Sequence, residues 1–364
     1  MRSFMTAIRP QAAVAILLAV LAISSSVGAP AQAGPQADLA RVQAQVNDLQ
    51  HVAEAATERF NEAKAGRDRV QAELSSLQAA ARRQGAQQQK SADMVDALAR
   101  AAYMSGSLDP TLELLLARDP AAFLAQGSAI QQLAKSQQAI LRRWATSTLR
   151  LQQTKSQVAQ RLAISKRLTD TMATAKSDAD SNLNKAQALL AQLTNQQRKR
   201  LAAIKAKARQ QALASAAKAR QQLAASTKRP GRAPGKSPLG YIGTTRAAAA
   251  VRYALSQVGK SYVAAQAGPR SYDCSGLTLA AWRQGGVGLT HYSKAQYSQT
   301  KRVPVSQIRP GDLVFYFGSG AHHVAIYVGN GKMVSASNPG DGVELIDFLG
   351  PWYRERFSGV GRVL

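Results

Sequence analysis

A long run of apolar residues at alternating spacings of three and four is the feature that most constrains this chain. No proline occurs between Gln36 and Pro110, so nothing in that interval interrupts a helix. The members of the run are Leu39, Val42, Val46, Leu49, Ala53, Ala56, Phe60, Ala63, Val70, Leu74, Leu77 and Ala81. A heptad pattern of this length predicts a coiled-coil helix over residues 38–100, about 90 Å long at 1.5 Å per residue.

A second heptad series predicts a helix that returns along the first. Its members include Ile130, Leu133, Ile140, Trp144, Leu151, Val158, Leu168, Met172, Ala175, Ala179, Ala186, Leu189 and Leu193. The turn-rich stretch between the series predicts a tip near 103–126, in which Asp109 and Asp119 cap short helices. We therefore expect an all-α coiled-coil hairpin over 34–225. Alternatively, each heptad stretch pairs with another chain, because a heptad pattern predicts an interface but does not identify the helix that packs against it. A protein partner or regulator could then bind there.

The N-terminus predicts export. The first ten residues contain the positive Arg2 and Arg9. The apolar run that follows, over 12–23, is too short to span a bilayer. Ala31-Gln32-Ala33 then provides a small-x-small cleavage site. We expect residues 1–33 to be a signal peptide, with an uncleaved anchor as the alternative. The predicted location is secreted and associated with the cell wall.

The charge of the chain is strongly positive and uneven. The formal net charge is +26, and no acidic residue occurs between Asp180 and Asp273. The basic segment 198–236 overlaps a Pro/Gly linker over 226–240, and its charge predicts attraction to anionic wall polymers. A solvated helix face is the alternative. Nucleic acid is not expected as a partner, because aromatic residues are not interleaved with the basic ones.

The composition changes near Tyr241, where aromatic residues, Val and Gly become common. Residues 241–364 have the size of one globular domain. The pattern predicts two helices, after Thr245 and around Leu277, followed by strand-like runs. These runs cover 313–317, 324–328, 333–336 and 343–346. Helices followed by an antiparallel sheet predict an α+β domain.

Cys274 is the only cysteine of the chain, so an intramolecular disulfide is excluded. It follows Asp273 at the predicted start of the second helix, where Asp273 can serve as the N-cap. The positive end of a helix dipole favours a thiolate, so we expect a lowered pKa and a nucleophilic role. A buried, inert cysteine is the alternative.

Four histidines are candidates for the partner base. His323 leads into the apolar run 324–328 before an Asn330-Gly331 hairpin turn, which predicts a histidine on a rigid strand. His51 occupies an outer heptad position and is expected on the surface. His322 is expected on the opposite face of the strand from its neighbour.

Three blocks of this sequence are similar to the hallmark motifs of the NlpC/P60 cell-wall peptidases. They are YVAAQAGPRSYDCSGL over 262–277, RPGDLVFY over 309–316 and HVAIYVG over 323–329. The resemblance implies a papain-like fold and hydrolysis of peptidoglycan stem peptides, commonly between D-γ-glutamate and the diamino acid. It implies these roles: Cys274 as nucleophile, His323 as base, Tyr262 at the oxyanion, Asp273 and Ser275 beside the substrate, and His291 near it. Ala264-Ala265-Gln266 departs from the usual Trp-Gly-Gly of the family.

The third catalytic position is the least certain part of the motif. Its position in the family pattern is occupied by Ser335, whose hydroxyl could accept the Nδ1–H bond of His323 without supplying a charge. A strict two-residue Asn330-Gly331 turn would instead place Asn338 opposite His323. A β-bulge would restore Ser335, so both residues remain candidates.

The sequence thus predicts a cysteine peptidase that needs no cofactor and no metal. One alternative is a wall-binding scaffold with a catalytically weak domain, motivated by the uncharged Ser335. Another is a related amidase or acyltransferase that uses the same cysteine and histidine.

Overall fold

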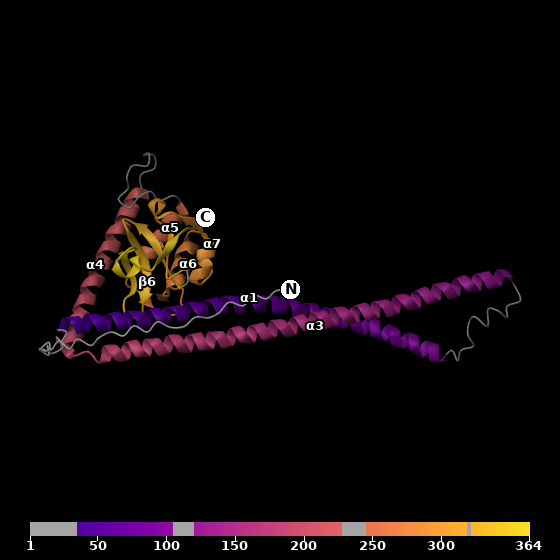
Figure 1. The fold of residues 1–364 in the computed structure, drawn as a ribbon. Coiled ribbons are helices and arrows are strands. Elements are labelled where there is room, and N and C mark those ends of the chain that lie inside the picture. Colours follow the sequence, from indigo (N-terminus) through magenta and orange to yellow (C-terminus); the bar gives the residue numbers. More distant parts are fainter. Residues whose placement is uncertain (1–34, 105–119, 228–244, 319–321) are drawn as a thin grey trace, which may run out of the picture.

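The computed structural model describes residues 35–104, 120–227, 245–318 and 322–364. The expected signal peptide, the expected caps at 109 and 119 and most of the Pro/Gly linker lie outside these residues. Two long helices, α1 (Pro35–Met104) and α3 (Pro120–Ala191), run side by side as an extended hairpin (Figure 1). The predicted helical hairpin is therefore confirmed.

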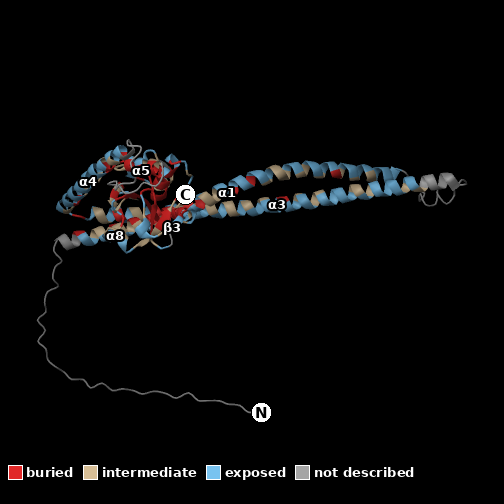
Figure 2. Ribbon diagram, turned by 90° about the horizontal axis from the view of Figure 1, so that it is seen from above, coloured by how far each residue is buried: buried red, intermediate tan, exposed pale blue. Residues whose placement is uncertain are grey.

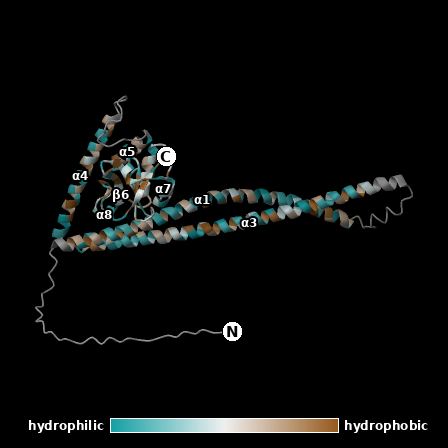
Figure 3. Ribbon diagram, turned by 45° about the horizontal axis from the view of Figure 1, so that its top comes forward, coloured by the Kyte–Doolittle hydropathy of each residue, from teal (hydrophilic) through white to brown (hydrophobic). Residues whose placement is uncertain are grey.

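Small residues form the seam of the hairpin where it passes the C-terminal domain. Ala53, Ala56 and Ala63 of α1 and Ala175 and Ala179 of α3 are buried. Alanine side chains let two helices approach closely, and apolar residues alternate with polar ones along both helices (Figure 3). Away from the domain the helices are mostly exposed (Figure 2).

The distal part of the predicted seam is not closed. Leu133 is 56% exposed and Trp144 is 39% exposed. Figure 1 shows α1 and α3 splaying apart toward these distal ends. The prediction that Leu133 and Trp144 are buried in a seam is therefore wrong, because the facing helix has diverged from them.

The helix α4 (Asn195–Thr227) leaves the hairpin and lies against the C-terminal domain (Figure 1). Leu223 and Ala216 of α4 are buried in the core of that domain. Lys205 also forms an ion pair of 2.7 Å with Asp341. The sequence assigned this segment to the hairpin, but its apolar face completes another core. Some of its positive charge is also paired within the chain.

The C-terminal domain consists of helices packed on an antiparallel sheet, which confirms the α+β prediction. The helices are α5 (Thr245–Gln257), α6 (Cys274–Gln284), α7 (Ser293–Gln299) and α8 (Pro351–Arg354), with the 3-10 helix η1 (Val305–Gln307). The strands are β1 (Ser261–Tyr262), β2 (Ser271–Tyr272), β3 (Lys301–Val303), β4 (Leu313–Tyr316), β5 (His323–Gly329), β6 (Lys332–Asn338), β7 (Gly342–Asp347) and β8 (Phe357–Arg362). Strands β1 and β2 form a separate parallel pair, and the main sheet has the order β3-β8-β4-β5-β6-β7. The four predicted runs correspond to β4 to β7.

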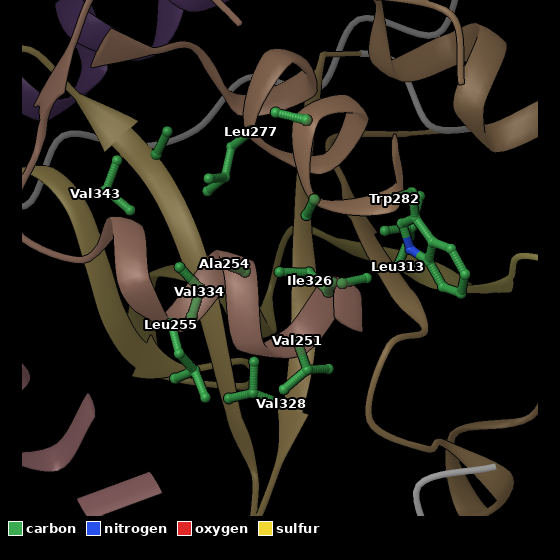
Figure 4. Close-up of a cluster of buried hydrophobic side chains, with 14 of the residues drawn as sticks. Val251, Ala254, Leu255, Leu277, Trp282, Leu313, Ile326, Val328, Val334 and Val343 are labelled. Carbon is green, nitrogen blue, oxygen red and sulfur yellow. The ribbon is translucent and has the colours of Figure 1, made fainter. Parts of the chain in front are cut away.

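The main core lies between the sheet and the helices α5 and α6 (Figure 4). Val251 and Leu255 of α5 and Leu277 of α6 face Ile326 and Val334 of the sheet, and all five are fully buried. This packing places the N-terminus of α6 against the start of β5. The arrangement fixes the two elements that carry Cys274 and His323.

Candidate active site

Cys274 is the first residue of α6, and its position is fixed by a well-formed cap. The Asp273 carboxylate accepts a hydrogen bond of 2.6 Å from the Gly276 backbone N–H. A side chain at Gly276 would collide with the Gln266 carbonyl oxygen, so the first turn of α6 requires glycine there. Cys274 is 1% exposed. The sulfur is thus held at the N-terminus of a helix, as expected.

His323 begins β5 and lies beside Cys274. A ring nitrogen of His323, the sulfur of Cys274 and a carboxylate oxygen of Glu54 all lie within 4.8 Å of one another. The other ring nitrogen, Nε2, lies 3.0 Å from the Ser335 hydroxyl. We expected Ser335 at Nδ1, but the structure reverses this, because Nδ1 is bonded to Glu54 instead.

A β-bulge explains which polar residue on β6 reaches His323. The register of β5 and β6 shifts between Tyr327 and Gly329. The bulge moves the pairing by one residue from that of a strict two-residue turn, so Ser335 shares a face with His323. Asn338 instead donates a hydrogen bond of 2.9 Å to Asp341.

The remaining predicted residues surround this centre. Tyr262 is buried, and its hydroxyl has no hydrogen-bond partner among the described residues. His291 Nε2 lies 2.8 Å from the Asp273 carboxylate. Burial lowers the pKa of His291, but the hydrogen bond to Asp273 and its charge outweigh burial and raise it. Ser275 is fully buried beside them.

Four polar residues of α1 enter the same site, and none of them was expected there. Glu54 accepts a hydrogen bond of 2.5 Å from His323 Nδ1. Glu58 accepts hydrogen bonds from the Ser275 hydroxyl, at 2.6 Å, and from the Ser293 backbone N–H. Asn61 donates one of 2.9 Å to Asp273. His51, the fourth, meets His322.

The prediction that His51 lies on the surface is wrong. Its Nε2 lies 2.9 Å from Nε2 of His322, and its ring stacks on Phe317. Burial and the neighbouring histidines lower the pKa of His51 to about 3 and that of His322 to about 4. Both rings are therefore neutral at pH 7, and one can donate to the other. The polar residues of α1 recur at spacings of three and four, a signal that also describes an ordinary solvated helix face.

The electrostatic environment of the thiol is the reverse of the expected one. Burial, followed by the carboxylates of Glu58, Glu54 and Asp273, raises the pKa of Cys274 well above its ordinary value. Burial and the charge of Asp273 likewise raise the pKa of Glu58 to about 7. The expected low pKa of Cys274 is wrong for this conformation, because burial and three nearby carboxylates outweigh the helix dipole.

Glu54, Cys274 and His323 are the group in the described part of the chain whose donor atoms lie close enough to share a metal ion. Carboxylate, thiolate and imidazole are all zinc ligands. Here a hydrogen bond between Glu54 and His323 accounts for the short separation.

None of the helices within the described ranges is long and apolar enough to cross a membrane.

Comparison with known proteins identifies the C-terminal domain. The model of the NlpC/P60 family matches residues 259–362. The chain is 41% identical over 116 residues to the probable endopeptidase p60 of Listeria innocua, covering 32% of this chain and 24% of that protein. It is 37% identical over 123 residues to the peptidoglycan endopeptidase RipA of Mycobacterium tuberculosis, covering 30% of this chain and 26% of that protein.

Two solved structures are similar to part of this chain. A structure of a mutated RipA is 31% identical, with a TM-score of 0.30, and covers 32% of this chain and 60% of that one. An NlpC/P60 family protein from Bacillus cereus is 28% identical, with a TM-score of 0.31, and covers 36% and 44%. The chain spans about a quarter of the length of the two curated relatives, the Listeria endopeptidase p60 and the Mycobacterium RipA.

Proposed function

Because residues 259–362 form a domain of the NlpC/P60 family, we propose that this chain hydrolyses peptide bonds in peptidoglycan stems by cysteine catalysis. The observation that carries the proposal is the meeting of Cys274, His323 and Ser335 at the junction of α6, β5 and β6. The names of the relatives support peptidoglycan as the substrate.

The geometry supports acyl transfer once α1 has left the site. The thiol proton of Cys274 passes to His323 Nδ1, and the sulfur attacks the stem-peptide carbonyl carbon. The Cys274 backbone N–H and the Tyr262 hydroxyl would stabilise the oxyanion. Tyr262 suits this role because its buried hydroxyl has no partner among the described residues.

Collapse of the intermediate breaks the C–N bond, and His323 donates its proton to the leaving amine. The same imidazole then takes a proton from water, whose oxygen attacks the thioester. The products are a new carboxylate and the regenerated thiol. Ser335 would hold the ring through Nε2 during both steps. The geometry favours Ser335 over Asn338, which is bonded to Asp341.

The specific bond and the location are also part of the proposal. The family resemblance supports cleavage between D-γ-glutamate and the diamino acid. Asp273, Ser275 and His291, which lie beside Cys274, would bind the substrate next to the scissile bond. The predicted signal peptide, together with the basic residues of α4, supports action at an anionic cell wall.

Two other functions remain to be separated by experiment. A scaffold would contain an inert thiol, but the closed conformation described here also makes the thiol of an enzyme inert. Titration of Cys274 therefore separates the two only after the α1 carboxylates have been removed. A related amidase or acyltransferase would give products of different mass.

Digestion of purified muropeptides by a chain without its α1 carboxylates, Glu54→Ala/Glu58→Ala, followed by mass spectrometry, tests the proposal. We expect two fragments whose masses add up to the substrate plus one water. Cys274→Ala should abolish their formation, because no other thiol exists in the chain. Full activity of that variant would rule out the mechanism, and transfer to an acceptor other than water would identify an acyltransferase.

A further inference from the structure

We propose that α1 is a built-in inhibitor that keeps the site latent, and that the α1–α3 hairpin leaves as one unit by turning at the corner before α4. This inference concerns the regulation of the active site and rests on the proposed function. It is carried by four observations: the plug, the blocked chemistry, the contrast between two interfaces, and the corner.

The plug is the polar face of α1. Glu54 is 6% exposed, Glu58 is 4% exposed and Asn61 is 2% exposed. Burying a carboxylate is costly unless hydrogen bonds replace its water. Here His323, Ser275 and Ser293 donate hydrogen bonds to the carboxylates of Glu54 and Glu58. Asp273 accepts a hydrogen bond from the Asn61 amide. All four partners lie in the C-terminal domain. The face is therefore complementary to the site.

The plug blocks each requirement of the reaction. Cys274 and His323 are each 1% exposed, so a peptide carbonyl cannot reach the sulfur. Glu54 occupies Nδ1 of His323, which must receive the thiol proton. The α1 carboxylates also raise the pKa of the thiol and so oppose formation of the thiolate.

The two interfaces of α1 differ in kind. Toward the active site, α1 presents His51, Glu54, Glu58 and Asn61. Toward α3 it presents the apolar seam, and ion pairs such as Arg59–Asp178 flank that seam. Water can replace polar contacts but cannot replace apolar burial, so α1 separates from the domain more readily than from α3.

The corner between α3 and α4 provides the hinge. The two helices are separated by residues 192–194, and Thr194 starts α4 with a capping box. Its backbone N–H donates to the Gln197 side chain at 2.9 Å, and its hydroxyl accepts from the Gln197 N–H at 3.2 Å. A short break between two stable helices can absorb a change in backbone angles.

The contacts of α4 keep it with the C-terminal domain during such a movement. Leu223 is buried in that core, Lys205 pairs with Asp341, and Arg209 donates to the Gly259 carbonyl at 3.0 Å. The domain would thus remain attached to α4 while the hairpin turns away. The active site would open without unfolding either part.

Alkylation of Cys274 by iodoacetamide in the full chain tests the plug without any substrate. We expect the double variant Glu54→Ala/Glu58→Ala to react at least tenfold faster than the unchanged chain. Glu73→Ala is the matched control, because Glu73 lies on α1 but pairs with Arg161 and is half exposed. Equal rates in the unchanged chain and the double variant, or equal acceleration by the control, would overturn the proposal.

A second variant keeps the test valid if the double variant loses stability. Asn61→Asp changes the side-chain volume very little. It replaces the amide that donates a hydrogen bond to Asp273 with a carboxylate that Asp273 repels. We expect the same acceleration, with a thermal unfolding curve close to that of the unchanged chain. A stable Asn61→Asp chain that reacts no faster would contradict the plug.

Hydrogen exchange of the Asn61→Asp variant tests movement as one unit. The Ser293 N–H, which Glu58 now binds, should lose protection, while amides of α1 around Ala56 keep theirs. Loss of protection along α1 would mean that the helix unfolds instead of turning. If the thiol becomes reactive but muropeptides stay intact, the plug stands and the proposed function fails.

Discussion

Individual carboxylates have different roles in this site because of their surroundings. Asp273 caps α6 and is hydrogen-bonded to His291, whereas Glu58 lies on α1 and accepts a hydrogen bond from the Ser275 hydroxyl. Cys274 and His323 could be singled out from the sequence, since helix starts and strand starts leave local signals. The α1 residues could not, because an outer heptad position is polar whether it faces water or a cleft.

The role of Ser335 gives a prediction at the residue scale. Ser335→Ala removes the group 3.0 Å from His323 Nε2, so the imidazole loses its orientation. A neutral hydrogen bond contributes about 1 kcal/mol, which corresponds to a loss of about fivefold in kcat. Asn338→Ala is the control and should change kcat little. A larger loss in Asn338→Ala than in Ser335→Ala would reverse the assignment.

The environment of Glu58 gives a prediction about pH. Its pKa is about 7 in the closed form, against an ordinary value of 4.5. Asp273, Glu54, Cys274 and His291 surround it, and opening would expose it to water. Closing between these two pH values therefore takes up a proton. The contribution to the closed form is fully present below about pH 4.5 and is lost as the pH rises from there through about 7.

Small-angle X-ray scattering between pH 4 and pH 8 measures this effect without relying on thiol chemistry. The ratio of open to closed chain should rise by up to about tenfold per pH unit between the ordinary pKa of 4.5 and the closed-form pKa of about 7, and it should level off above pH 7. Glu58→Gln mimics the protonated acid and should remove most of the change. A curve that is the same for both proteins would show that another group controls opening.

At the scale of elements, α4 differs most from its prediction. Its many alanines and basic residues resemble those of the hairpin, so the sequence assigned it there. The structure shows that its apolar face completes the core of the C-terminal domain, with Leu223 fully buried. Helix propensity and charge were readable from the sequence, but the identity of the surface that a helix covers depends on tertiary packing.

Truncation of Leu223 tests the place of α4. Leu223→Ala should lower the free energy of unfolding of the C-terminal domain by about 2–5 kcal/mol, because it leaves a cavity in the core. Because the chain has three tryptophans, denaturation is followed in a Trp144→Phe/Trp352→Phe background, where the fluorescence of Trp282 in that core reports this domain. Ile204→Ala is the control, since Ile204 is 50% exposed and should cost little. Equal effects would place α4 outside the core.

At the scale of the whole molecule, the sequence predicted two parts but not their contact. The hairpin and the α+β domain each follow from local periodicity, because a helix has a period of 3.6 residues and a strand a period of two. Their docking joins Glu54 to His323, across most of the chain, through polar contacts that no periodicity encodes. The β-bulge near Gly329 was similarly undetermined, since either register satisfied the apolar pattern.

The rate of stem-peptide hydrolysis by the full chain with and without its α1 carboxylates tests the account most directly. Glu54→Ala/Glu58→Ala should release peptide at least tenfold faster than the unchanged chain, and adding Cys274→Ala should abolish that release. If the unchanged chain and the double variant hydrolyse at the same rate, or if hydrolysis survives without Cys274, the account is contradicted.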